Sequence, residues 1–303
     1  MLTSPYAVLV RDDRPGYRPY EVTVTRLTEL SPHFVRVTFT GPDLSTFGTD
    51  GLDQRIKLMF PVNGELPRLG ADWWETWRSM PNEARNPIRT YTVRAVRQGA
   101  AEIDVDFVAH GDGGPAARWL LTAAIGDPLV IVGPDAHSVD SAGGIDWHPG
   151  SATDVLLAGD ETATPAICSI LESLPAGMRA TAFIEVPSRS DVLPLESAAD
   201  VSVTWLARDE HETLEPAVRA WVDAHNGVIT LAPSPQEVED VDVDVDLLWD
   251  APLDAEGSFY AWLAGEASVI KSLRRLLVSE RGVDRRRVAF MGYWRLGRAE
   301  GQE

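Results

Sequence analysis

Two segments decide the fold of this chain: Arg89-Thr90-Tyr91-Thr92-Val93-Arg94 and, about one hairpin further on, His110-Gly111-Asp112-Gly113-Gly114-Pro115-Ala116-Ala117-Arg118-Trp119. The first has the pattern of a strand with cations and a ring, and the second that of a small-residue turn opening a helix. A guanidinium binds phosphate in planar, bidentate geometry, an aromatic ring can stack beside a flat heterocycle, and glycine-turn N–H groups can approach phosphate oxygens. Together the segments predict a flavin nucleotide site, although the first alone would fit an ordinary amphipathic strand.

The first half of the chain has the pattern of an antiparallel β-domain. Turn residues such as Gly41-Pro42-Asp43 and Gly126-Asp127-Pro128 separate short β-rich runs. These runs are Tyr20–Leu27, Phe34–Thr40, Gln54–Pro61, Arg89–Val96, Glu102–Ala109 and Pro128–Gly133. Six strands of even length predict a six-stranded antiparallel Greek-key barrel. One helix, Ala116–Ala124, follows the Gly-Gly-Pro turn, so its N-terminus points at whatever the turn holds.

From about Ser151, strands and helices alternate. Val155–Ala158 is wholly apolar, as expected of a strand covered on both faces of a parallel sheet. A helix capped by Thr162 or Thr164 follows it. We expect further strands at Thr181–Val186, Val201–Leu206, Val228–Leu231, Phe259–Ala264 and Val288–Tyr293, and helices near Leu214–His225 and Ala267–Arg281. This pattern predicts a doubly wound parallel-sheet domain with its ligand at the carboxyl ends of the strands, and hence two domains, residues 1–150 and 151–303.

Composition restricts the partners of the chain. The formal net charge of −19 argues against nucleic acid and anionic membrane surfaces, which are bound through clustered lysine and arginine. No run of 18 apolar residues and no secretory leader pattern occur, so we expect no membrane span and a cytoplasmic protein. We also expect a monomer. The six histidines are scattered, and we expect no protein-bound metal. Cys168, the single cysteine, is expected to be a buried, inert thiol.

Three further motifs accompany the flavin pattern: Gly159-Asp160-Glu161-Thr162-Ala163, Ala264-Gly265-Glu266-Ala267 and Gly292-Tyr293-Trp294-Arg295-Leu296-Gly297. None is a Gly-x-Gly-x-x-Gly fingerprint, so a standard Rossmann signal is absent. In this order, after an Arg-x-Tyr-Ser/Thr segment, they resemble the siderophore-interacting proteins, the flavin-dependent ferric-siderophore reductases of the ferredoxin-reductase superfamily. The resemblance runs from about Pro19 to Gly297.

The resemblance implies an NAD(P)H-dependent ferric-siderophore oxidoreductase. NAD(P)H would deliver a hydride to bound FAD, and single electrons would then reduce a ferric siderophore and release Fe(II). The cofactor carries this chemistry, so we expect no catalytic acid, base or nucleophile. Two alternatives stay open: a general NAD(P)H-dependent reductase of flavins or quinones, and a non-catalytic siderophore-binding protein with bound FAD.

Candidate cofactor-binding residues follow from the motifs. For FAD they are Arg89, Tyr91, Thr92, Val108, His110, Gly113, Gly114, Ala116, Ala117 and Trp119. His110 would donate to a phosphate or ribityl oxygen or merely cap a turn, and Trp119 would be a core residue first and an adenine neighbour second. At the second domain they are Asp160, Thr162, Ala163, Glu185, Glu266 and Trp294. Glu185 could accept from ribose hydroxyls, which slightly favours NADH, whereas Arg189 or Arg208 could pair with a 2′-phosphate.

The resemblance also implies a basic cleft for the ferric siderophore. The candidate residues are Lys57, Arg295, Lys271 and Arg275, of which the last two are outlying. The family often carries arginine after Gly-Pro, but here the segment is Gly133-Pro134-Asp135, so a highly anionic siderophore is less expected than a neutral or mixed-charge chelate.

Two segments fit neither domain pattern. Trp73-Trp74-Glu75-Thr76-Trp77 is expected to be a loop packed by its own aromatic side chains, with a partner surface as the alternative. Residues Glu237 to Asp246 alternate acids with valine and are expected to form a solvated acidic insertion.

Overall fold

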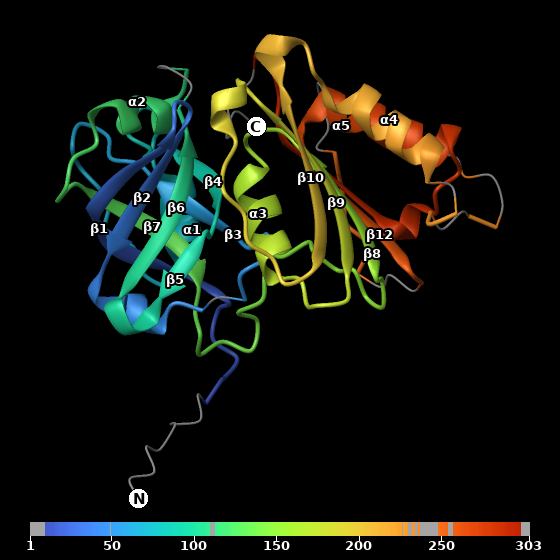
Figure 1. Ribbon diagram of the computed structural model, residues 1–303. Helices are drawn as coiled ribbons and strands as arrows, with labels where there is room; N and C mark the ends of the chain where they lie inside the picture. The colour runs from blue at the N-terminus through green and yellow to red at the C-terminus, as the bar shows by residue number, and fades with distance from the viewer. Residues whose placement is uncertain are drawn as a thin grey trace, which may run out of the picture.

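A barrel and an α/β sheet lie side by side in the computed structural model (Figure 1), which describes residues 10–48, 50–109, 113–225, 227–229, 232–233, 236, 248–253 and 257–297. The first sheet has seven strands and the second has six. Within the described residues, no helix is both long and apolar enough to cross a membrane. The acidic segment Glu237–Asp246 lies outside the described residues.

The barrel is built from antiparallel pairs in the order β4-β3-β7-β1-β2-β6-β5. Its strands are β1 (Tyr17–Ser31), β2 (Phe34–Thr40), β3 (Arg55–Met59), β4 (Ile88–Thr92), β5 (Ala95–Arg97), β6 (Glu102–Val108) and β7 (Pro128–Pro134). β7 returns from the end of the domain to lie between β1 and β3, as a Greek key requires. The predicted antiparallel barrel is confirmed.

One predicted barrel strand, Arg89–Val96, is divided into β4 and β5. The Val93 amide donates to the Gln54 carbonyl at 2.9 Å, and the Arg94 amide donates to the Asp104 carbonyl at 3.0 Å. The segment therefore leaves β3 and joins β6 within two residues. This bend connects the two ends of the strand order and closes the barrel.

The tryptophan segment forms a short helix, α1 (Trp73–Ser79), on the outside of the barrel. Trp73 and Trp77 pack against a cluster that includes Met59 and Val132, and the Trp77 indole donates to the Asn86 carbonyl at 2.7 Å. Trp74 is 43% exposed and stacks on Trp77 with ring centroids 5.3 Å apart. The segment is thus packed by its own aromatic rings, as expected, but as a helix.

The second sheet has the order β10-β9-β8-β12-β13-β11, and all its pairs are parallel except that of β11 with β13. Its strands are β8 (Asp154–Gly159), β9 (Arg179–Val186), β10 (Asp200–Ala207), β11 (Trp249–Asp250), β12 (Phe259–Glu266) and β13 (Val288–Trp294). This confirms the doubly wound α/β fold. The predicted strand Val228–Leu231 is not supported, because Val228 lies in a turn and Ile229 in a bend. The rest of it falls outside the described residues.

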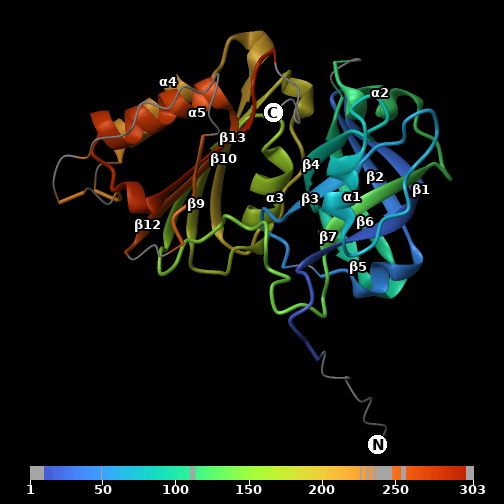
Figure 2. The ribbon, with the colours of Figure 1, turned by 180° about the vertical axis from the view of Figure 1, so that it is seen from behind.

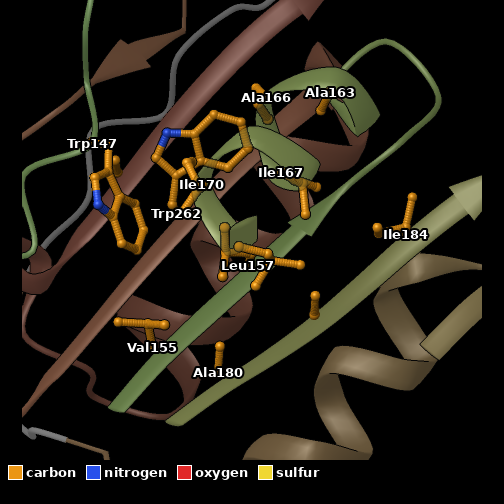
Figure 3. Packing of buried hydrophobic residues seen from close by; sticks show 14 of the residues in the cluster. Trp147, Val155, Leu157, Ala163, Ala166, Ile167, Ile170, Ala180, Ile184 and Trp262 are labelled. Atoms are coloured by element: carbon orange, nitrogen blue, oxygen red, sulfur yellow. The ribbon is translucent and has the colours of Figure 1, made fainter. Parts of the chain in front are cut away.

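Helices and the barrel cover the two faces of this sheet. α3 (Thr164–Ser173) and the barrel lie on one face, and α4 (Leu214–Ala224) and α5 (Ala267–Arg274) lie on the other (Figures 1 and 2). Figure 3 shows the packing on the α3 side, where Ile167 and Ile170 meet Leu157 and Trp262. Neighbouring residues of β8 point to opposite faces and every one is buried, which explains its wholly apolar core.

Polar contacts fix the barrel against the sheet domain. The Asp191 carboxylate, fully buried after β9, accepts from the Ser31 hydroxyl at 2.7 Å and lies 2.8 Å from Nδ1 of His33. Arg94 pairs with Glu172 of α3 at 2.5 Å. The Trp262 indole donates to Asp53 at 3.0 Å. These contacts hold the end of β4 close to α3, so the candidate flavin strand lies at the junction.

Candidate functional site

β4 presents its candidate residues on two faces, because successive strand side chains alternate. On the inner face, the Tyr91 ring lies 4.5 Å from the Phe107 ring, and Nη1 of Arg89 donates to the Ile88 carbonyl at 2.7 Å. On the outer face, Thr92 is buried and the Thr90 hydroxyl accepts from Nζ of Lys57 at 2.6 Å. β4 therefore places the predicted arginine and ring on one face and the predicted hydroxyl groups on the other.

The glycine turn opens directly into α2 (Pro115–Thr122). Gly114 is extended, with φ −162°, and a Cβ placed on it would meet no heavy atom of the described residues within 4 Å. Pro115 occupies the first turn, and the first backbone N–H groups of a helix, here those of Ala116 and Ala117, have no partner within the helix. Such groups and this open space suit an anion. His110 lies outside the described residues.

Trp119 packs in the barrel core. Its ring centroid lies 5.6 Å from that of Phe107, 5.6 Å from that of Phe60 and 6.2 Å from that of Phe39. This confirms its expected core position, while its role beside an adenine stays a prediction. Val108, at the end of β6, also packs on buried apolar side chains.

The three motifs of the second domain meet at one carboxylate, that of Asp160. Oδ1 accepts from the Thr162 amide at 2.9 Å and from its hydroxyl at 2.5 Å. Oδ2 accepts from the Glu266 amide and from the Trp294 indole, both at 2.8 Å. Burial, followed by the charge of Glu161, raises the pKa of Asp160 to about 6. The convergence at the carboxyl edge was predicted, but the hydrogen-bonded centre was not.

The expected threonine cap of α3 was wrong. Ala163 occupies the cap position without a side-chain hydrogen bond, and the Asp160 carbonyl accepts from the amides of Ala163 and Thr164, each at 3.0 Å. The Thr162 hydroxyl is directed to Asp160 instead. Glu266 caps α5, because its carboxylate accepts from the amides of Ser268 at 2.8 Å and Val269 at 3.1 Å.

An ion-pair chain runs along the edge of β8, β9 and β10. Arg208 pairs with buried Glu161 and, at 2.8 Å, with Glu185. The other oxygen of Glu185 accepts from the Leu214 amide at 3.1 Å, at the start of α4. Arg189 likewise pairs with two carboxylates, Glu210 at 2.7 Å and Glu212 at 2.5 Å. The role of Glu161 was missed; two adjacent acids after a buried strand were the available signal.

The candidate siderophore cations lie in different places. Lys57 is on β3 and donates to the hydroxyl of Thr90 on β4. Arg295 directly follows Trp294 at the end of β13. Lys271 is on α5, and Arg275, with a 79% exposed side chain, begins the π-helical turn Arg275–Glu280 that continues it. α5 covers the sheet face opposite the barrel (Figure 1). Asp135 is buried, and its carboxylate lies 3.3 Å from Nε of Arg18.

A hollow of about 610 Å³ lies on the barrel surface, away from all these residues. Its lining includes Glu21, Thr40, Pro67, Arg68 and Val130. No candidate cofactor residue lines it, so we place the functional site at the junction rather than in this hollow.

The residues at the barrel edge fit a flavin dinucleotide. The guanidinium and the N-terminal N–H groups of α2 are donors of the kind that bind a pyrophosphate. The aromatic ring and the hydroxyl groups are of the kind that contact a flat heterocycle. A barrel of this kind, packed with a helix on one face of a parallel sheet, is the fold of the ferredoxin-reductase-like proteins. A ferredoxin reductase of carbazole 1,9a-dioxygenase shares this fold, with a TM-score of 0.60 at 11% identity, covering 92% of this chain and 68% of that one.

Family models assign the chain within that class. The model of the siderophore-interacting FAD-binding domain matches residues 23–138, and that of the siderophore-interacting protein matches residues 152–297. The chain therefore belongs to the siderophore-interacting protein family and carries its FAD-binding domain.

Individual relatives agree with this assignment. An uncharacterized protein of Mycobacterium tuberculosis is 37% identical over 93% of this chain and 91% of its own. Ferric vibriobactin reductase of Vibrio cholerae is 29% identical over 93% of this chain and 91% of its own. The siderophore-interacting protein of Aeromonas hydrophila has a solved structure with a TM-score of 0.65 at 30% identity, covering 94% of this chain and 95% of that one.

Proposed function

We propose that this protein is a FAD-dependent ferric-siderophore reductase that uses NAD(P)H. The observation that carries the proposal is the packing of the barrel, which holds the flavin-type strand β4, against the α/β domain, through the Arg94–Glu172 and Asp191–His33 contacts. The family match and the names of the reductases among its relatives support it. We propose a division of roles after residue 150, with FAD held by the barrel and NAD(P)H by the sheet domain.

The barrel residues would bind FAD as follows. Arg89 and the Gly113–Ala117 turn would hold the pyrophosphate, while Tyr91 would pack against the flavin ring and Thr92 would hydrogen-bond its edge. FAD, when bound, accepts the hydride of NAD(P)H and passes on electrons one at a time. The chain itself binds, orients and shields, so we assign no acid, base or nucleophile.

We propose NADH as the preferred reductant. Arg208 lies between Glu161 and Glu185, and Arg189 lies between Glu210 and Glu212, so each candidate partner of a 2′-phosphate is already paired with two carboxylates. A 2′-phosphate would have to displace these acids or face their charge. Glu185 retains lone pairs for a ribose hydroxyl.

Lys57 and Arg295 are the cations that we propose for the ferric siderophore, with Lys271 and Arg275 as more distant candidates. The family often carries arginine at the position of Asp135, so this chain lacks that positive charge. The Asp135 carboxylate is buried and paired with Arg18. A chelate of low or mixed charge fits this arrangement better than a highly anionic one. We further propose that the protein acts in the cytoplasm as a monomer. Burial raises the pKa of the Cys168 thiol to about 12, which fits an inert cysteine.

NADH oxidation by the FAD-loaded protein tests the function. We expect a ferric hydroxamate or ferric catecholate chelate to accelerate it, and free FMN or a quinone to do so much less. Acceleration only by flavin or quinone would favour a general reductase, and chelate binding without NADH oxidation would favour a binding protein.

A further inference from the structure

Every oxygen of the Asp160 carboxylate is already engaged by protein donors. Four hydrogen bonds reach it from Thr162, Glu266 and Trp294, which lie on three separate segments. Its residue is 5% exposed. A group in this position has little capacity left to bind a cofactor, although it lies at the edge where a nucleotide site is expected.

Glycines create the space that this carboxylate occupies. A Cβ on Gly265, whose φ is +152°, would lie 2.7 Å from Oδ2 of Asp160. A Cβ on Gly159 would lie 2.6 Å from both Cβ of Ala163 and the Ala264 carbonyl oxygen. The glycines of two motifs therefore serve close packing around Asp160, so these motifs have an internal role.

We infer that Asp160 is a positioning residue that holds the Trp294 indole and the Glu266 backbone in place before any cofactor binds. The inference rests on the proposed function only in that Trp294 is expected near the cofactors. Three of the four donors are N–H groups, which match an ionised acceptor better than a carboxylic acid. The charged and titratable groups around it are Glu161 with its partner Arg208, the side chain of Glu266, which ends β12 and caps α5, and Tyr293 of β13.

The Trp294 indole N–H resonance in ¹H–¹⁵N spectra of the ligand-free protein tests this directly, and Trp294→Phe assigns it. We expect the wild-type resonance to move with a midpoint near the Asp160 pKa of about 6. Asp160→Asn replaces one accepting oxygen by an NH₂ group, which then faces either the two Thr162 donors or the Glu266 and Trp294 donors. The indole resonance should therefore be displaced and should not titrate. Asp223→Asn, on the exposed face of α4, is the matched control and should behave as wild type.

Stopped-flow reduction by NADH supplies the functional readout. Asp160→Asn and Trp294→Phe should each slow flavin reduction, by roughly ten- to a hundredfold for the loss of a hydrogen bond to a charged group, with little change in NADH affinity. Weakened NADH binding with an unmoved indole resonance would make Asp160 a ligand and overturn the inference. An indole resonance that neither titrates nor responds to the substitution would also overturn it.

Trp294→Phe keeps the test decisive if Asp160→Asn does not fold, because it removes the donor and leaves the carboxylate in place. A wild-type protein that NAD(P)H does not reduce would refute the proposed function, while the indole titration would still decide the role of Asp160.

Discussion

The barrel side and the sheet side of the site differ in how their polar groups are used. On the barrel side, no heavy atom of the described residues lies within 4 Å of a Cβ placed on Gly114, and the first backbone N–H groups of α2 have no partner within the helix. On the sheet side, the Asp160 carboxylate accepts four hydrogen bonds from the protein, and Arg208 forms ion pairs with two acids. The Glu266 carboxylate caps the start of α5. The contrast teaches that a motif can mark where a ligand binds while its polar residues bond one another.

The largest expected effect comes from Gly265→Ala. A methyl group 2.7 Å from Oδ2 of Asp160, at a φ of +152°, combines a clash with backbone strain. We expect the free energy of unfolding to fall by about 2–5 kcal/mol, measured by denaturant titration without ligand. Gly114→Ala is the matched barrel-side control and should leave this free energy unchanged while weakening FAD binding. Equal stability of the two variants would remove the contrast between the sides.

The pH dependence of stability should isolate Asp160. Its pKa is raised from 3.8 to about 6 in the folded protein, so the folded state keeps a proton that the unfolded state loses. Stability from this group therefore falls as the pH rises from 4 to 6, by up to about 3 kcal/mol, and is level above that window. Asp104 and Asp191, whose pKa values are lowered, act in the opposite direction. The unfolding free energies of wild type and Asp160→Asn should accordingly be subtracted at each pH; a constant difference would contradict the assignment.

Arg89→Ala tests whether the barrel side is reserved for a ligand. Losing a hydrogen bond between a charged group and phosphate typically costs about 1.5–3 kcal/mol, so FAD retention should weaken by roughly ten- to a hundredfold. The thermal stability of the ligand-free protein should change little. Arg89→Lys keeps the charge without the bidentate geometry and should give an intermediate result. FAD occupancy after gel filtration measures the effect, and unchanged occupancy in the alanine variant would refute the role of Arg89.

A smaller effect, on the choice between NADPH and NADH, is expected from removing one of the two ion pairs of Arg208. Glu185→Gln removes one of its two acidic partners, so NADPH should gain against NADH by roughly fivefold, about 1 kcal/mol, in kcat/KM. Glu215→Gln, which removes one of the two acidic partners of Arg219 on α4, is the control and should leave the ratio unchanged. A wild-type enzyme with a strong NADPH preference would contradict the account of this edge.

The smallest effect concerns Lys57. Lys57→Ala should slow flavin reoxidation by an anionic ferric chelate by roughly two- to fivefold, as expected for the loss of one half-buried charge that solvent still reaches, and leave reduction by NADH intact. Raising the ionic strength should act in the same way, because such charges are screened over about 8–10 Å at physiological salt. Thr90→Val removes the hydroxyl group that accepts from Lys57 but keeps the lysine charge, and it should have less effect.

Alternation along strands and strand–helix order were enough to predict the type of both sheets, most of their strands and the meeting of the motifs, but not β11, and the strand expected at Val228–Leu231 is not supported. The division of β4 from β5 was not predictable, because it depends on the bonds of Val93 to Gln54 and of Arg94 to Asp104 across the barrel. The threonine cap of α3 was wrong for a similar reason, since Thr162 is drawn to a carboxylate that tertiary packing buries. Local sequence signals predicted elements and their order, whereas pairings between distant segments set the hydrogen-bonded centre.

Single-turnover release of Fe(II) tests the central claim most directly. FAD-loaded protein is reduced with one equivalent of NADH without oxygen and mixed with a ferric siderophore and a ferrous-specific chromogenic chelator. The account predicts that the oxidised flavin spectrum returns as the ferrous complex appears, at one Fe(II) per electron. Return of the oxidised spectrum without Fe(II), or a reduced spectrum that persists when the ferric siderophore is present, would contradict it.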